Sequence, residues 1–147
     1  MSTAKNLQAL ADLCNKAAHE ALEALLKLGP RPASPATAGF LWDQCHTRLT
    51  GQINSLTALA SKLSASSVLS ALDTAQADLV QLATITKTAQ ARIKKIQEVS
   101  ELLTTLGRVL DVGLAILAVA TAPSPATAAA LAQKIKELAK DVAGDGG

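Results

Sequence analysis

Aromatic residues are almost absent from this chain. Its 147 residues include one phenylalanine, one tryptophan and no tyrosine, while alanine (30 residues) and leucine (24 residues) make up more than a third of the total. Strands are enriched in aromatic and β-branched residues, whereas alanine and leucine are strong helix formers. The composition therefore predicts an all-α protein, and the length is that of a single domain over residues 1–147.

Cysteine is also scarce, and there is little excess of one sign of charge. Two cysteines are too few for a disulfide scaffold, and 14 basic against 12 acidic side chains leave a net charge of only +2. We therefore expect a reducing compartment, the cytoplasm, and no nucleic-acid partner. A signal peptide is not expected either, because Asn6, Gln8 and Asp12 interrupt the N-terminal stretch.

Proline and glycine mark most of the expected helix boundaries. A first helix over 4–28 ends at Gly29 and Pro30, and a proline-rich loop follows over 29–39. A second helix over 40–63 places Trp42, Cys45 and Leu49 on its inner face.

The C-terminal part of the chain has equally clear turn signals. Ser124 suits the N-cap and Pro125 the first position of a last helix over 125–142. The residues after it, 144–147, read as a frayed tail. The two helices on either side of this turn would form a proline-marked helical hairpin.

The stretch from 66 to 121 contains no proline, and its apolar or small residues recur alternately three and four apart. This is the a/d pattern of a helix packed along its length, and it predicts one long central helix of roughly 84 Å. Such a length is several times the mean, so we expect a bend near the threonine-rich residues 84–88 or near residues 104–107. The whole would be an antiparallel bundle of four to five helices.

A mismatch of lengths follows from this prediction. The first two helices, each roughly 37 Å long, would cover only the first half of the central helix. Its far end and the last helix include residues 112–133, which carry no charge at all. That stretch would be an interface, a membrane-inserting hairpin, or simply core if the long helix breaks near 84–88 into a compact five-helix bundle.

One group of residues could suggest chemistry. His19 and Glu23 would lie level with Cys45, His46 and Arg48 if the first two helices fold back on each other, and such side chains can bind zinc or form a nucleophile with a base. The spacing matches no HExxH, CxxC or Glu-x-x-His motif. We therefore predict no catalytic residue, no metal site and no cofactor.

The densest basic run is interpreted as a solvated helix face. Lys87, Arg92, Lys94 and Lys95 have no aromatic residues among them for stacking on bases, and acidic residues follow directly.

The sequence thus predicts a non-catalytic interaction protein of the adaptor, chaperone-like or toxin-neutralising type, which binds a protein partner or itself through an apolar helical face. The expected contact residues are Leu103, Leu106, Leu110, Leu114, Leu117 and Leu131. The alternative is a membrane-active or pore-forming protein that inserts residues 112–133, and a weaker alternative is a carrier of an apolar ligand.

Overall fold

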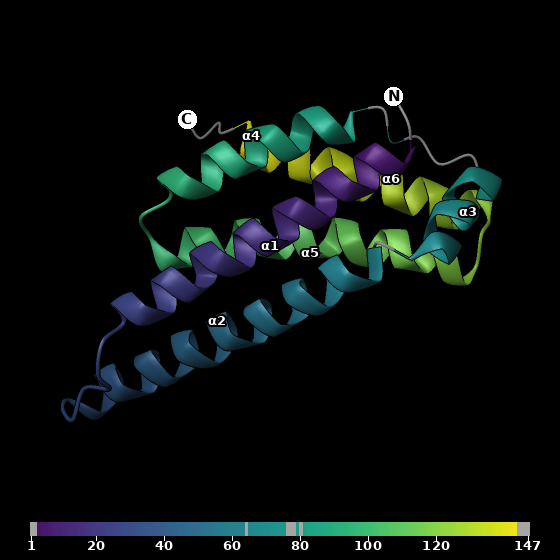
Figure 1. The fold of residues 1–147 in the computed structure, drawn as a ribbon. Coiled ribbons are helices and arrows are strands. Elements are labelled where there is room, and N and C mark those ends of the chain that lie inside the picture. The colour runs from purple at the N-terminus through teal and green to yellow at the C-terminus, as the bar shows by residue number, and fades with distance from the viewer. Residues whose placement is uncertain (1–2, 64, 76–78, 80, 144–147) are drawn as a thin grey trace.

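The computed structural model describes residues 3–63, 65–75, 79 and 81–143, and in that part of the chain it contains six helices and no strand (Figure 1). The prediction of an all-α protein is confirmed. The predicted frayed tail, 144–147, lies outside the described residues. The helices are α1 (Thr3–Lys27), α2 (Ala36–Leu63), α3 (Ser66–Ala75), α4 (Leu82–Lys95), α5 (Val99–Thr121) and α6 (Pro125–Val142).

Helix α5 contacts α6, α3, α2 and α1, and α1 likewise contacts four of the other helices. Its buried residues recur three and four apart, as in a helix with one broad apolar face. They include Leu102, Leu106, Val109, Gly113 and Ile116. This apolar face packs α5 against α6, α3 and α2 (Figure 1).

The prediction of a single long helix over 66–121 is wrong. The chain there forms three helices, α3, α4 and α5, so the described residues contain six helices instead of four to five. Among the described residues, the chain is not helical at residues 79 and 81, between α3 and α4, and at residues 96–98, between α4 and α5. The places where a bend was expected, 84–88 and 104–107, lie inside α4 and α5.

The threonines at those two places do not interrupt the helices, although their hydroxyls bond to helix carbonyls. Thr86 and Thr88 each donate to a carbonyl three or four residues earlier, at 2.8 and 3.1 Å. Thr104 does the same at 3.1 Å. Back-bonding of this kind destabilises a helix only slightly, and the packing of α4 and α5 outweighs it, so the threonine content misled the prediction.

The break at 96–98 has no local breaker residue. Ile96 and Glu98 both adopt extended backbone, with φ/ψ of −71°/129° and −89°/131°. Ile96 and Val99 pack against the core, and Arg92 of α4 forms an ion pair with Glu101 of α5. Packing of α5 against α1 and α2 therefore overrides the local preference for a continuous helix.

Glycine and proline mark the helix boundaries much as expected. Gly29 has a φ of 66°, the left-handed conformation that ends α1. Ser124 accepts a hydrogen bond from the Thr127 amide at 3.2 Å, and Pro125 begins α6. One boundary differs, because α2 begins at Ala36 instead of residue 40.

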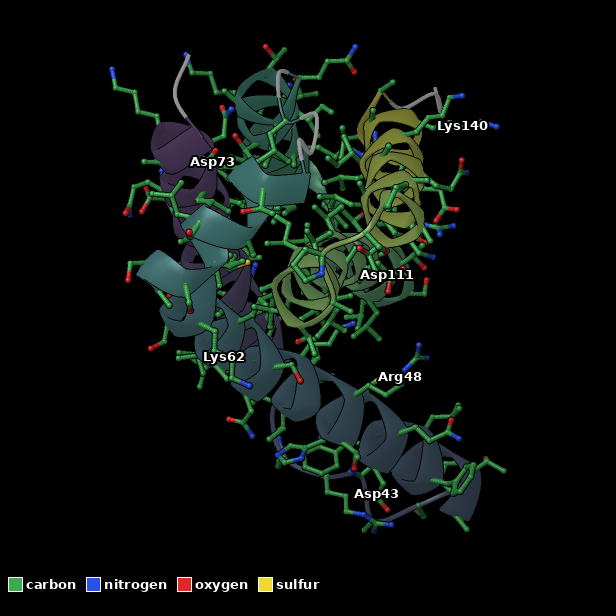
Figure 2. The ribbon with its side chains drawn as sticks, turned by 90° about the vertical axis from the view of Figure 1, so that its right-hand side faces the viewer. Asp43, Arg48, Lys62, Asp73, Asp111 and Lys140 are labelled. Atoms are coloured by element: carbon green, nitrogen blue, oxygen red, sulfur yellow. The ribbon has the colours of Figure 1, made fainter. Side chains whose placement is uncertain are left out.

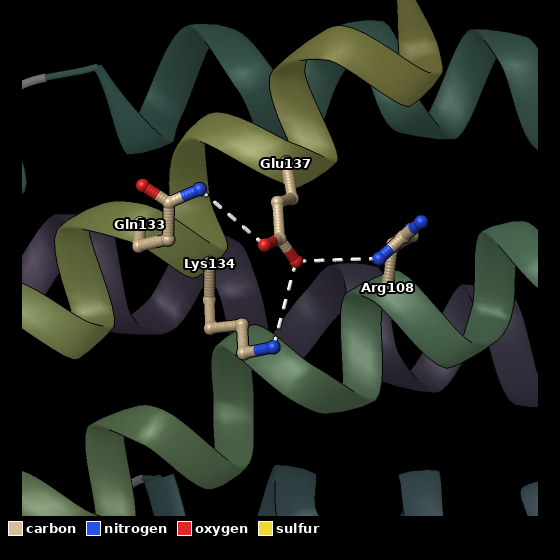
Figure 3. A network of polar contacts seen from close by, with 4 residues as sticks. All are labelled: Arg108, Gln133, Lys134 and Glu137. Carbon is tan, nitrogen blue, oxygen red and sulfur yellow. Dashed lines mark hydrogen bonds and ion pairs between the residues drawn. The ribbon is translucent and has the colours of Figure 1, made fainter.

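Polar contacts hold α6 on α5 (Figure 3). The Glu137 carboxylate accepts hydrogen bonds from Gln133 at 3.4 Å, Arg108 at 3.2 Å and Lys134 at 3.5 Å. The bond from Gln133, together with the charges of Lys134 and Arg108, holds the pKa of Glu137 below its usual range. Arg108 lies on α5 and the other three residues lie on α6, so this network links the two helices.

Candidate interaction surface

The α1–α2 pair extends beyond the helix that covers it. Two contacts give the register between α2 and α5: Gln52 donates to the Leu103 carbonyl at 3.1 Å, and Leu59 packs directly on Gly113. Because α5 begins only four residues before Leu103, it starts level with about residue 48 of α2. Residues 36–47 of α2, about 18 Å of helix, therefore lie past the end of α5.

We call residues 22–47 the overhang. It comprises the end of α1, the connecting loop and the first part of α2. Figure 1 shows it extending beyond the other helices, and Figure 2 shows Asp43 near its far end. The predicted mismatch of lengths is therefore reversed, since α2 has 28 residues and α5 only 23.

Exposed apolar side chains concentrate on the overhang. Among the described residues, five large apolar side chains are exposed, and four of them belong to it. The exposed fractions are 42% for Leu22, 68% for Leu26, 60% for Phe40, 59% for Leu41 and 57% for Leu114 on α5. Leu22 and Leu26 lie one turn apart on the same face of α1.

Polar contacts anchor the loop of the overhang to α2. Arg31 donates two hydrogen bonds to Asp43, at 2.9 and 3.0 Å, and its guanidinium covers Gly39, where a Cβ would lie 2.9 Å from Nη2. The hydrogen bonds and the charge of Arg31 hold the pKa of Asp43 below its usual range. A bidentate pair of this kind fixes geometry as well as adding attraction.

Trp42 makes a second anchor. Its indole N–H donates to the Gly29 carbonyl at 3.2 Å, and its ring stacks on His46 with centroids 4.8 Å apart. Trp42 and Cys45 are both half-buried, so the prediction that they lie in the core holds only in part. These contacts give the overhang a defined shape despite its position outside the main core.

A hollow of about 700 Å³ lies between α1 and the turn from α4 to α5. Its lining includes the apolar residues Ala24, Ile96 and Val99 and the charged residues Glu20, Glu23, Lys27, Lys94, Lys95 and Glu98. A lining with both signs of charge suits a polypeptide better than an apolar small molecule.

The structure places the six predicted contact leucines in three different environments. Leu103, Leu106 and Leu131 are buried within the fold. Leu110 and Leu117 are half-buried, and Leu114 is exposed. The first three are brought together as core because the chain folds back at 96–98 and places α5 among the other helices.

The residues considered for chemistry do not assemble into a metal site. No three His, Cys, Asp or Glu side chains come close enough to hold an ion anywhere in the described ranges. Cys14 is fully buried, and burial raises the pKa of its thiol to about 12. Such a thiol stays protonated and unreactive at neutral pH.

Sequence reasoning missed Phe40 and Leu41 as surface residues. Leu41 falls on the same helical face as Leu49 and Leu56, both fully buried, so periodicity alone assigns it to the core. The signal in the sequence for their exposure was the proline-rich loop, which marks the end of the α1–α2 pair. How much of α2 is covered, however, depends on where α5 begins.

Comparison of the chain with models of protein families, with curated proteins and with solved structures finds no match in any of the three.

Proposed function

We infer that this chain is a non-catalytic, cytoplasmic interaction protein: a helical bundle that binds a protein partner, or itself, through the overhang. The observation that carries this proposal is that four of the five exposed large apolar side chains of the described residues, Leu22, Leu26, Phe40 and Leu41, lie on the overhang. The proposal moves the contact surface from the leucines of α5 to the end of the α1–α2 pair.

The energetics favour a covered overhang. Removing half-exposed leucine and phenylalanine side chains from water contributes about 1 kcal/mol each. Because the Arg31–Asp43 and Trp42–Gly29 contacts already hold the loop in place, binding need not order it. A partner therefore gains the apolar contact at a small entropic cost.

The charges nearby point to recognition and not to catalysis. Arg31 and Asp43 neutralise each other, and the hollow beside α1 has acidic and basic side chains in its lining. Such an arrangement suits the polar surroundings of a protein interface, in which apolar contacts supply most of the binding energy.

A photo-crosslinking experiment tests this function. Leu41 is replaced by p-benzoylphenylalanine in cells that make the protein, and the same replacement at Leu114, which is about equally exposed but lies on α5, is the matched control. We expect an adduct with a polypeptide at position 41 and none at 114. Absence of any adduct at 41, or equal adducts at both positions, would contradict the proposal.

A second candidate function is a membrane-active protein. Among the described helices, α5 is the one long and apolar enough to cross a bilayer, with a mean hydropathy of 1.8 over its best window. Half of that window is buried, as is usual for a core helix of a globular protein, so insertion would require α5 to leave the bundle. Release of a dye from anionic liposomes at neutral or acidic pH would support this function, and intact liposomes at both would remove it.

A further inference from the structure

Carboxylates without a partner gather in the hollow between α1 and the α4–α5 turn. Glu20, Glu23 and Glu98 all line it, and none of them makes a hydrogen bond or ion pair with the described residues. The other carboxylates of the described ranges have such a partner, with the exception of Asp111 on α5. The hollow therefore holds most of the acidic groups that the fold itself leaves unsatisfied.

Positive charges without a partner line the same hollow. Lys94 and Lys95 lie in the last turn of α4, at the hollow's edge toward α5, and neither of them is hydrogen-bonded or ion-paired in the part of the chain that the structure describes. Opposite them, α1 contributes Glu20 and Glu23. A ligand that satisfies both helices therefore carries both signs of charge.

The turn beside the hollow also offers main-chain groups without a partner. The chain leaves α4 there and turns back into α5 (Figure 1), with extended backbone at Ile96 and Glu98. Between them, Gln97 is exposed, lines the hollow and makes no hydrogen bond with any described residue, through its main chain or its side chain. Free N–H and C=O groups at a short extended segment can pair with an added peptide strand.

We propose that the hollow binds an extended segment of another polypeptide, in which an apolar side chain lies between a basic and an acidic one. The apolar side chain rests on Ile93 and Leu102, which are buried in the lining. The basic side chain lies toward Glu20 and the acidic one toward Lys94. The peptide's main chain pairs with that of Gln97.

This site goes beyond the proposed function. It adjoins the overhang, with which it shares Glu23, Ala24 and Lys27. The four exposed apolar side chains of the overhang take no part in it, so the two sites can be tested separately.

Other ligand classes suit the hollow less well. No three carboxylates, imidazoles or thiols among the described residues come together to hold a metal ion. A polyanion would meet the repulsion of Glu20, Glu23 and Glu98. An apolar molecule would cover charged groups without satisfying them, which costs free energy. A peptide offers both charges, an apolar side chain and main-chain partners together.

The exposure of the charges sets the expected strength. Most of the charged side chains in the lining are exposed, and exposed ion pairs contribute little each. We therefore expect a dissociation constant on the order of 10–100 µM, as in transient recognition of short segments.

A library selection supplies the probes for the test. The full chain is screened against a phage-displayed library of random linear octapeptides, and fluorescence polarisation measures the affinity of synthetic copies of the enriched peptides. We expect these peptides to share an apolar residue between a basic and an acidic one. A screen that enriches no peptide, or only peptides without this pattern, contradicts the proposal.

Charge reversal then locates the bound peptide. Glu20→Lys removes a carboxylate of the hollow, and Asp111→Lys is the matched control, because both residues are half-buried and unpartnered among the described residues. Glu20→Lys is expected to weaken binding about tenfold, since it replaces attraction with repulsion, while Asp111→Lys keeps the native affinity. Equal affinities of the two variants would overturn the site. Far-ultraviolet circular dichroism checks that each is folded.

A second pair of variants tests the main-chain contact. Gln97→Pro removes the N–H at the centre of the turn, whereas Gln97→Ala removes only the side chain beyond Cβ. We expect at least about fivefold weaker peptide binding for Gln97→Pro and the native affinity for Gln97→Ala. Equal affinities of these two variants would show that the peptide does not pair with the main chain at this position.

Leu41→Lys separates this inference from the proposed function. The selected peptides should keep their affinity for this variant, and loss of binding would place them on the overhang and overturn the site in the hollow. An adduct from the photoprobe at position 41, without any peptide bound in the hollow, leaves the proposed function standing and ends this inference. Peptide binding in the hollow without an adduct at 41 has the reverse meaning.

Discussion

Two glycines of α5 have opposite surroundings. At Gly113 a Cβ would overlap Cδ2 of Leu59 and lie 2.8 Å from its Cγ, so the whole leucine side chain would have to move. At Gly107 the nearest atom, Nε2 of Gln52, would be 4.0 Å away, which is ordinary contact. The lack of a side chain at Gly113 therefore permits the close approach of α2 and α5. Gly107 does not lie at such a close contact.

We predict that Gly113→Ala lowers the free energy of unfolding by about 1–3 kcal/mol, because it overpacks the α2–α5 contact. Gly107→Ala, the matched control, is expected to be neutral or to stabilise by up to about 1 kcal/mol through helix propensity. Urea unfolding followed by circular dichroism measures both. Equal stability of the two variants would contradict the close approach at Gly113.

The Arg31–Asp43 pair predicts a local pH dependence. Because Arg31 lowers the pKa of Asp43 below the ordinary 3.8, the pair stabilises the loop at higher pH, and this stabilisation is lost as the pH falls through the lowered pKa. Both side chains are about half exposed, so the effect is confined to the overhang.

The measurement for this pair is the NMR chemical shift of the Trp42 indole N–H and the Gly39 amide against pH. We expect both to move toward loop-released values as the pH falls below the ordinary aspartate pKa of 3.8. Asp43→Asn should show released values already at neutral pH. Identical neutral-pH spectra for the native chain and Asp43→Asn would show that the pair does not anchor the loop.

At the scale of elements, the turn from α4 to α5 decides the architecture. Ile96 has the extended backbone that a residue before proline requires, whereas Lys87 is exposed in the interior of α4. A continuous helix would make both positions equally intolerant of proline, so a pair of proline variants tests whether the chain is interrupted.

We predict that Gln97→Pro changes the free energy of unfolding by less than about 1 kcal/mol, while Lys87→Pro lowers it by about 3 kcal/mol or more. The difference arises because proline removes a helical hydrogen bond only at position 87. Urea unfolding and helical content by circular dichroism give the comparison. Similar losses in both variants would favour a continuous helix across 96–98.

At the scale of the whole molecule, the two cysteines differ in burial, so their reactivities test the fold. Cys14 is fully buried in α1 with a pKa raised to about 12, and Cys45 is half-buried on the overhang. Reaction of the first thiol requires unfolding of the core, whereas the second can react in the native state.

We expect a thiol reagent at pH 8 to modify one cysteine per native chain and both in urea, as counted by mass spectrometry. Cys45→Ser should leave the native chain unmodified, and Cys14→Ala should leave the native count at one. Rapid modification of Cys45→Ser without denaturant would contradict the burial of Cys14.

The success of prediction differs from place to place for physical reasons. The end of α1 and the start of α6 were predictable because Gly29, Ser124 and Pro125 act through their own backbone chemistry. The break at 96–98 was not, since its residues are ordinary helix formers and only contacts with distant helices favour the extended backbone there. The exposure of Leu41 was missed for the same reason.

The sequence alone determined that the chain is helical, where its glycine and proline boundaries fall, and which faces of the helices are apolar. These are properties of single residues and of spacing along one helix. The tertiary structure decided which apolar faces are covered, because cover depends on how far one helix reaches along another. The fold-back before α5 buried Leu103 and Leu106 and left the start of α2 extending past the end of α5.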